Sequence, residues 1–186
     1  MEKKLLIGIL GSTNSGRTYT WNNLFRRNVI TGKNIRKLYL NDHEYVNVFL
    51  INGSPQERKR NVNEIIKKTS PRIVLCSLHY GKGIYETLDY FIKNDYFLYI
   101  LWLNPGYKDP HDKTLFYNVG IINKLLTLNS IIGIRNGKGD VTERIREIRE
   151  YIYGWAKCRN LVWVKYKSRR KKKPEKDDDV YRLDFS

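Results

Sequence analysis

A glycine-bounded loop between an apolar run and a polar segment constrains this fold more than any other feature. Residues 5–10 are apolar apart from a glycine and predict a buried strand. The loop that follows reads Gly11-Ser12-Thr13-Asn14-Ser15-Gly16-Arg17-Thr18. Gly11 and Gly16 allow the backbone to curl, so that successive N–H groups and the start of the next helix face a common point. The segment therefore predicts a strand, an anion-binding loop and a helix in that order.

The spacing of this loop fits the phosphate-binding pattern G-x-x-x-x-G-K-[ST] except at Arg17, which replaces the lysine. In this motif the chain resembles the P-loop NTPases. The resemblance implies that residues 11–18 bind the phosphates of ATP or GTP and that the Thr18 hydroxyl binds Mg²⁺. Arginine is longer and planar, so Arg17 can neutralise phosphate without being equivalent to lysine. An ordinary glycine- and serine-rich turn between a strand and a helix is the alternative.

The order of the remaining elements predicts the fold class. Strands are expected at residues 3–10, 35–40, 45–51, 72–78, 96–103 and 130–134, and helices at 18–28, 56–69, 84–93, 111–128 and 141–155. The second and third strands are close enough to form an antiparallel hairpin, whereas strands separated by helices pair in parallel. We therefore predict a three-layer α/β fold of the P-loop NTPase type. Its sheet has about six mostly parallel strands and one antiparallel edge hairpin, with helices on both faces.

Length, charge and cysteine usage predict one domain over residues 1–156 and a basic, partly mobile tail over residues 157–186. Hydrophobic residues make up 41% of the 186 positions, enough for one core. Cys76 lies in an apolar run, which predicts a buried thiol. The two cysteines, Cys76 and Cys158, do not have the spacing of a metal-ligand motif. We see no transmembrane segment and no signal peptide, and therefore expect a cytoplasmic protein.

The net charge of +16 predicts a polyanionic partner such as nucleic acid or an acidic membrane surface. Residues 1–156 contain 24 basic and 14 acidic side chains and therefore carry +10 by themselves. A lysine-rich compositional bias, as in an AT-rich genome, is the alternative. In the tail, residues 160–167 alternate enough to form a short strand or a docked peptide. The residues expected to bind the polyanion are Lys165, Lys167, Arg169, Arg170, Lys171, Lys172 and Lys173.

Over about residues 1–156 the order of elements also resembles a degenerate small Ras-like GTPase domain. The place of its D-x-x-G motif reads Asn52-Gly53-Ser54-Pro55, and Gln56 and Glu57 follow. The resemblance implies that Asn52 lies at the nucleotide and that Gln56 positions the attacking water. Glu57 is a substitute catalytic carboxylate or, alternatively, a first-turn helix acid. Asn52 in place of the aspartate and Arg17 in place of the lysine predict slow turnover. The incomplete base-reading motif gives no preference for guanine over adenine.

The sequence thus predicts a nucleotide-binding P-loop protein with degenerate catalytic motifs. We expect a weak NTPase or a non-hydrolysing switch, with ATP or GTP and Mg²⁺ as cofactors and a basic tail that binds a polyanion. His79 and Lys82, near another strand end, are further candidates for an acid and a phosphate clamp. The two alternatives are a nucleic-acid-binding protein on a degenerate P-loop scaffold and a nucleotide kinase.

Overall fold

The computed structural model describes residues 4–66, 69–81, 83–105, 120–128 and 130–165. The strands are β1 (Lys4–Gly11), β2 (Arg36–Tyr39), β3 (Glu44–Ile51), β4 (Ile73–His79), β5 (Tyr96–Leu103), β6 (Ser130–Arg135) and β7 (Trp163–Val164). The helices are α1 (Arg17–Phe25), α2 (Val62–Ile66), α3 (Ile84–Lys93), α4 (Ile121–Leu126) and α5 (Thr142–Lys157).

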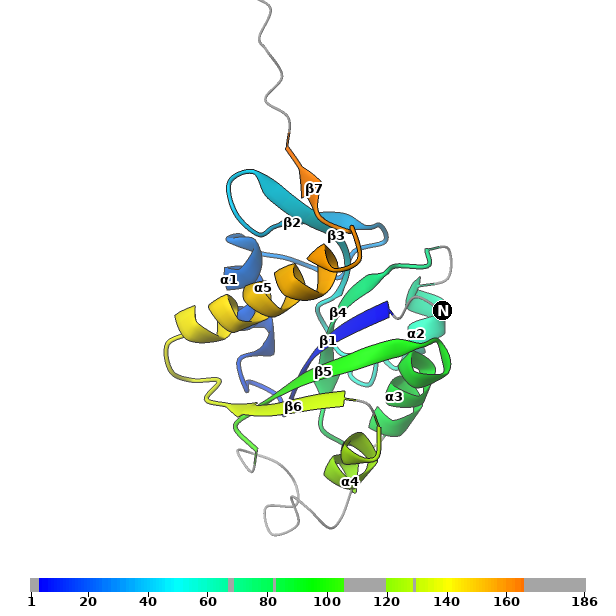
Figure 1. Ribbon diagram of the computed structural model, residues 1–186. Helices are drawn as coiled ribbons and strands as arrows, with labels where there is room; N and C mark the ends of the chain where they lie inside the picture. Colours follow the sequence, from blue (N-terminus) through cyan, green and yellow to red (C-terminus); the bar gives the residue numbers. More distant parts are fainter. Residues whose placement is uncertain (1–3, 67–68, 82, 106–119, 129, 166–186) are drawn as a thin grey trace, which may run out of the picture.

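The strands form one mixed sheet in the order β2-β3-β4-β1-β5-β6 (Figure 1). Strands β3, β4, β1, β5 and β6 are parallel to their neighbours, and β2 is antiparallel to β3. The short strand β7 pairs antiparallel with the first half of β3. The prediction of a mostly parallel α/β sheet with an antiparallel edge hairpin is therefore confirmed, and a short strand is present at Trp163–Val164, within the segment 160–167.

Helices cover both faces of the sheet, with α1 and α5 on one face and α2, α3 and α4 on the other (Figure 1). Strand β1 shows why, because its alternate side chains enter different cores. Leu5, Ile7 and Ile9 pack with α1 and α5, whereas Leu6 and Leu10 pack with the opposite layer. This arrangement buries every residue of β1 after Lys4, and it places the carboxyl end of β1 next to the start of α1.

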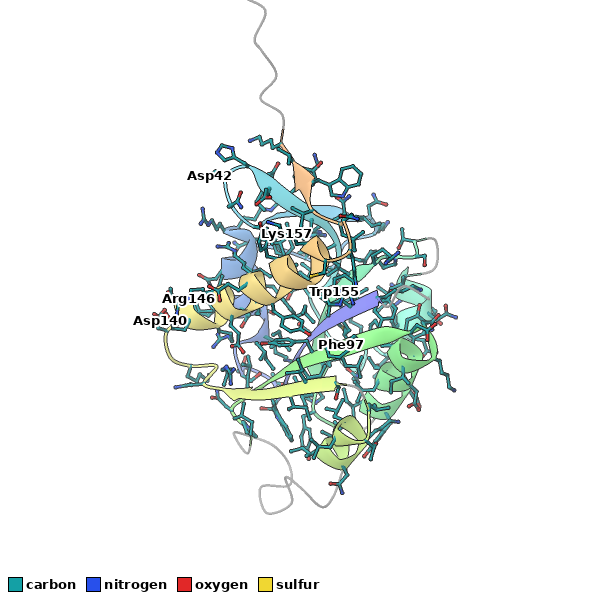
Figure 2. All side chains as sticks on the ribbon, in the orientation of Figure 1. Asp42, Phe97, Asp140, Arg146, Trp155 and Lys157 are labelled. Carbon is teal, nitrogen blue, oxygen red and sulfur yellow. The ribbon has the colours of Figure 1, made fainter. Side chains whose placement is uncertain are left out.

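Helix α5 follows its predicted pattern. Ile145, Ile148 and Ile152 are buried in the core, and Trp155 packs against it partly buried. At the first turn, Asp140 Oδ1 accepts a hydrogen bond from the backbone N–H of Thr142 at 3.0 Å, as expected of a residue that satisfies a free helix amide. Figure 2 labels Asp140 at the start of α5 and Trp155 toward its other end.

The helix predicted over residues 56–69 is wrong in its first half. Residues 55–59 are turns, and α2 spans only Val62–Ile66. The reason is local, because Lys59 N–H binds the Gln56 carbonyl three residues back and Arg60 N–H binds the Pro55 carbonyl five residues back, while Lys59 adopts a φ of 50°. Tight turns therefore replace the first helical turns and hold Glu57 over the end of the sheet.

Three further expectations differ in extent or lie partly outside the described residues. Helix α1 ends at Phe25 because Arg26 adopts a left-handed φ of 53° and its N–H binds the carbonyls of the last turn. Of the helix expected at 111–128, residues 121–126 are helical, and residues 106–119 lie outside the description. Cys76 is buried, as predicted, and burial raises the pKa of its thiol. Among the described residues, no helix is long and apolar enough to cross a membrane.

Candidate functional site

The loop at residues 11–16 turns tightly between β1 and α1. Asn14 and Gly16 have positive φ angles of 64° and 103°, and Ser15 N–H donates to the Ser12 carbonyl at 3.2 Å. The Ser15 side chain is completely buried and folds back on Gly11, where an added Cβ would lie 2.3 Å from Ser15 Oγ. The interior of this loop is therefore occupied by a serine hydroxyl, which has no hydrogen-bond partner within the described chain.

A second loop, after β6, lies directly against the first. A Cβ at Gly16 would be 2.4 Å from the carbonyl oxygen of Gly137, and a Cβ at Gly137 would be 1.9 Å from that of Ser15. Asn104 Oδ1, at the end of β5, accepts a hydrogen bond from Gly137 N–H at 2.9 Å and holds the second loop in place. Both glycines are therefore required because two backbones touch here.

Between these loops, at the start of α1, lies a cavity of about 640 Å³. The described residues that line it are Asn14, Gly16, Arg17, Thr18, Tyr19, Gly137, Lys138 and Gly139. No carboxylate is among them, and α1 has neither an acidic residue in its first turn nor a side-chain cap. The free N–H groups and the positive end of the helix dipole at this position favour an anion.

A buried arginine from α5 adds positive charge behind the cavity. Arg144 is only 3% exposed. Its Nε donates to Thr20 Oγ1 at 3.1 Å, and its Nη1 donates to the Asn136 carbonyl at 2.5 Å. Its Nη2 has no hydrogen-bond partner within the described residues. Burial lowers the pKa of the Arg144 guanidinium. Arg144 thus joins α1 to the second loop. It forms no direct ion pair in the described part of the chain, although the nearby charges of Asp140 and Glu147 partly oppose the effect of burial on its pKa.

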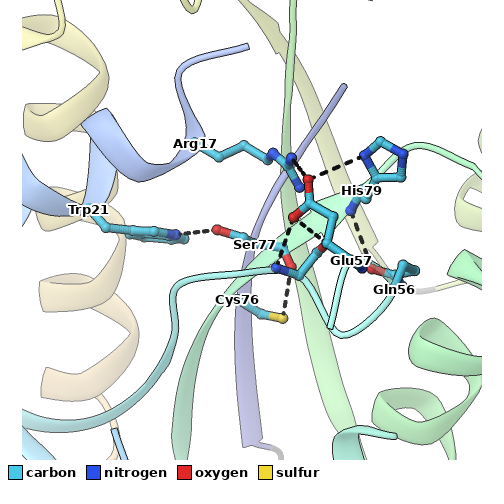
Figure 3. Close-up of polar contacts among 8 residues, drawn as sticks. Arg17, Trp21, Gln56, Glu57, Cys76, Ser77 and His79 are labelled. Atoms are coloured by element: carbon cyan, nitrogen blue, oxygen red, sulfur yellow. Dashed lines mark hydrogen bonds and ion pairs between the residues drawn. The ribbon is translucent and has the colours of Figure 1, made fainter. Parts of the chain in front are cut away.

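Arg17 reaches away from the loop toward Glu57 (Figure 3). Its Nη2 forms an ion pair with Glu57 Oε1 at 2.5 Å, and only 7% of its side chain is exposed. The other oxygen of Glu57 accepts a hydrogen bond from Ser54 Oγ at 2.7 Å, and His79 Nδ1 lies 3.7 Å from Oε1. Burial raises the pKa of Glu57, but the hydrogen bonds from Ser54 and Arg17 and the charge of Arg17 outweigh it and lower the pKa.

Gln56, predicted to position water, makes hydrogen bonds with two other elements instead. Its Nε2 donates to Thr87 Oγ1 at 2.7 Å. Its Oε1 accepts from the backbone N–H of His79 at 3.3 Å, as Figure 3 shows. The side chain thereby ties the loop after β3 to α3 and to the end of β4. Its predicted catalytic role stays a prediction, and these contacts give it a positioning role in the fold.

Asn52 lies apart from residues 11–18. Strand β4 separates β3 from β1, which is two strand spacings or about 10 Å. Asn52 N–H donates to Thr31 Oγ1 at 2.9 Å, and its Nδ2 donates to the Val29 carbonyl at 2.5 Å. These contacts hold the segment that enters β2, so the structure brings Glu57 to Arg17 but does not bring Asn52 to the loop.

The predicted metal and polyanion residues are only partly covered. Thr18 is exposed at the cavity, but no carboxylate lines the cavity and no cluster of three acidic, histidine or cysteine ligands occurs in the described residues. These residues do not form a Mg²⁺ site of their own. Lys165 is described and exposed. The remaining tail residues expected to bind the polyanion lie outside the described residues: Lys167, Arg169, Arg170, Lys171, Lys172 and Lys173. Lys82, after β4, also lies outside them.

Sequence reasoning missed the cations and the aromatic ring at the cavity. Arg144 had a usable signal, because it interrupts the apolar face that Val141, Ile145 and Ile148 form on one helix. Lys138 and Tyr19 had no such signal in the sequence, since only the fold brings these two residues to the same cavity. A scan against models of known protein families finds no match to this chain, and a search of curated proteins finds no similar sequence.

Proposed function

We propose that the protein binds the phosphates of a nucleoside triphosphate, ATP or GTP, in the cavity at the start of α1, and hydrolyses it slowly or not at all. The observation that carries the proposal is the cavity of about 640 Å³, whose described lining combines a helix N-terminus and Lys138 with no carboxylate. A volume of this size is typical of small-ligand sites.

Charge supports phosphate as the ligand. A helix start without an acidic residue leaves its N–H groups available to an anion. Arg144 is buried behind them, its Nη2 has no hydrogen-bond partner in the described residues, and Asp140 and Glu147 act on it only at a distance, so a bound anion would stabilise it further. An anion with several charges would offset this arrangement better than a neutral ligand.

An exposed ring supports a nucleotide over inorganic phosphate. Tyr19 lines the cavity and is 55% exposed, so its face is available for stacking against a base. The neighbouring Gly137 and Gly139 present backbone rather than bulky side chains. One nucleotide could therefore stack its base on Tyr19 and place its phosphates at the start of α1 within the same cavity.

Slow turnover follows from the contacts of the predicted catalytic residues. The Glu57 carboxylate is held by Arg17 and Ser54, and the Gln56 amide is held by Thr87 and His79. Neither group lines the cavity. Phosphoryl transfer depends on positioned groups that neutralise the developing charge, and these two are engaged elsewhere.

Titration with ATP, GTP, tripolyphosphate and adenosine tests the proposal. We expect the triphosphates to raise the unfolding midpoint, because a ligand at a hundredfold excess over Kd stabilises a protein by about 2.7 kcal/mol. Thr18→Glu places a negative charge in the cavity and should weaken ATP binding about tenfold or more by repulsion. Tyr19→Ala should weaken ATP binding and leave tripolyphosphate binding unchanged.

The matched control is Asn123→Glu on α4. Asn123 is exposed in the first turn of a helix that likewise has no acidic residue there. Both variants add the same charge at a helix start, where it favours the helix, so neither should lower stability. If both reduce ATP affinity equally, or if no triphosphate binds the folded protein, the proposal is wrong.

A further inference from the structure

A second surface lies at the opposite end of α1 from the cavity, where β7 extends the β2–β3 hairpin into three antiparallel strands (Figure 1). Tyr39 pairs directly with Tyr45, and Tyr45 pairs directly with Trp163. Directly paired residues project from the same face of a sheet. The three rings therefore form an aromatic row across the strands, in which Tyr39 is 44% and Trp163 is 54% exposed.

Lysines lie over the rings of this row. Lys37 Nζ is 4.3 Å from the centroid of the Tyr45 ring, and Lys165 Nζ is 5.7 Å from that of Tyr39. The rings of Tyr39 and Tyr45 are themselves 5.7 Å apart and tilted. Cations and aromatic faces thus alternate over this sheet surface, on which Tyr39 and Trp163 are exposed and Tyr45 is half-buried.

A basic groove of about 470 Å³ runs beside this row along the edge strand β2. Its cationic residues come from three parts of the fold, the end of α1, the strands and α5: Arg26, Arg27, Lys37, Arg149 and Lys165. Asp42, labelled at the hairpin turn in Figure 2, is the carboxylate among the described residues that line it. We call the aromatic row and the basic groove together the β7 surface.

The cations of the groove are not neutralised within the described part of the chain, where none of the five forms an ion pair with a carboxylate. Arg149 is partly buried. Its Nη2 donates to the Leu24 carbonyl at 2.8 Å, while its Nε is buried without a partner. Burial and the nearby charge of Arg26 both lower the pKa of Arg149, which shows that like charges are crowded here. An anionic partner would relieve this repulsion.

We propose that the β7 surface binds single-stranded nucleic acid, with bases stacked on Tyr39 and Trp163 and phosphates bound along the groove. Exposed rings beside lysines and arginines are the combination that single strands require, because unpaired bases stack on aromatic faces and the backbone follows positive charge. A duplex keeps its bases stacked inside and would leave the aromatic row unused. An acidic peptide would satisfy the cations alone. This site is separate from the proposed nucleotide cavity.

Fluorescence anisotropy of a labelled oligothymidylate tests the proposal with the full chain. A length of about 12 nucleotides falls in the range that single-strand-binding surfaces cover. We expect Trp163→Ala to weaken binding about tenfold, the effect of losing one stacked base, and Trp163→Phe to retain most of it. Lys37→Gln should flatten the slope of log affinity against log salt by about 0.7, the value for one phosphate contact.

Two variants with the same chemistry elsewhere serve as controls. Tyr85→Ala removes a ring that also has a lysine over it, Lys124 at 4.8 Å, but on the opposite side of the molecule, where Asp89 pairs with that lysine. Lys93→Gln removes an exposed charge at the end of α3. Both should leave oligonucleotide affinity and its salt slope unchanged, and thermal unfolding of each variant checks that the overall fold is retained.

The alternatives give different results. Equal loss in Trp163→Ala and Tyr85→Ala, or no loss in either, would overturn the proposal. So would a duplex of the same length that binds as tightly as the single strand, because the bases would then not be read. Polyglutamate that competes as well as the oligonucleotide at equal charge would assign the groove to an acidic peptide instead. Failure of ATP to bind would not affect this site.

Discussion

At the scale of single residues, the contacts of Arg17 and Glu57 have the largest consequence. The sequence places Arg17 at the phosphate position of its motif, yet the side chain is buried in an ion pair with Glu57, forty residues further along. An arginine reaches farther than a lysine and forms a planar, directional pair with a carboxylate. Arg17, which replaces the lysine of the motif, therefore also joins α1 to the loop after β3 through its ion pair with Glu57.

Replacing Glu57 by glutamine measures how much the Arg17–Glu57 ion pair contributes to stability. The pKa of Glu57 is lowered in the folded protein, so its stabilising effect is present above its unfolded pKa of about 4.3 and is lost as the pH falls through the folded pKa. We expect Glu57→Gln to lower the free energy of unfolding by about 1–2 kcal/mol at pH 7, because the carboxylate is partly exposed. Below pH 4, urea unfolding should show the difference from wild type shrinking.

Glu64→Gln is the control, since Glu64 forms an exposed pair with Arg60 at 3.8 Å. Such pairs contribute about 0.5 kcal/mol or less. A pH-independent effect of Glu57→Gln would mean that the ion pair does not stabilise the fold.

At the scale of elements, the two loops at the cavity depend on each other. The loop after β1 and the loop after β6 approach so closely that neither Gly16 nor Gly137 leaves room for a side chain. Arg144 and Asn104 reinforce this contact from α5 and β5. The start of α1 is therefore set by elements more than one hundred residues away, which makes the cavity a rigid feature rather than a local turn.

Gly16→Ala tests this packing. Its φ of 103° and the Gly137 oxygen 2.4 Å from the added Cβ both oppose a side chain, so we expect a loss of about 2–4 kcal/mol in unfolding free energy. Gly154→Ala is the matched control, because Gly154 lies in α5 with nothing within 4 Å of its Cβ position. That variant should gain about 0.5–1 kcal/mol through helix propensity. Thermal and urea unfolding measure both variants. A Gly16→Ala variant as stable as the wild type would contradict the packing argument.

At the scale of the whole molecule, positive charge is present at both ends of α1 and continues into the tail. The net charge of +16 includes the basic residues 167–173, which directly follow the β7 surface in the chain. Positive charge spread over a surface draws polyanions by long-range attraction, and its effect falls with salt. Sequence-independent binding should therefore combine the tail with the groove.

The contribution of the tail can be separated in the full chain. Lys171→Gln combined with Lys172→Gln should flatten the salt slope of oligonucleotide binding by up to about 1.4, corresponding to two phosphate contacts. Lys59→Gln combined with Lys93→Gln removes the same charge from exposed positions outside the β7 surface and should not. Anisotropy at three salt concentrations measures both. Identical slopes in the two double variants would show that the tail takes no part in binding.

What the sequence determined by itself was local. Continuous apolar runs indicated the strands, the spacing in residues 141–155 indicated α5, and the glycines indicated the turn before α1, because each depends on neighbours within a few positions. The short link between β2 and β3 likewise determined their antiparallel pairing.

Only the tertiary structure decided which strand ends meet. Local patterns carry no information on strand order, and β4 between β3 and β1 separates Asn52 from the loop while the turn after β3 brings Glu57 to Arg17. The same is true of Arg144 beside Thr20 and of Trp163 beside Tyr45, whose contacts join segments far apart in the chain. Such contacts arise from packing of whole layers, which no single segment encodes.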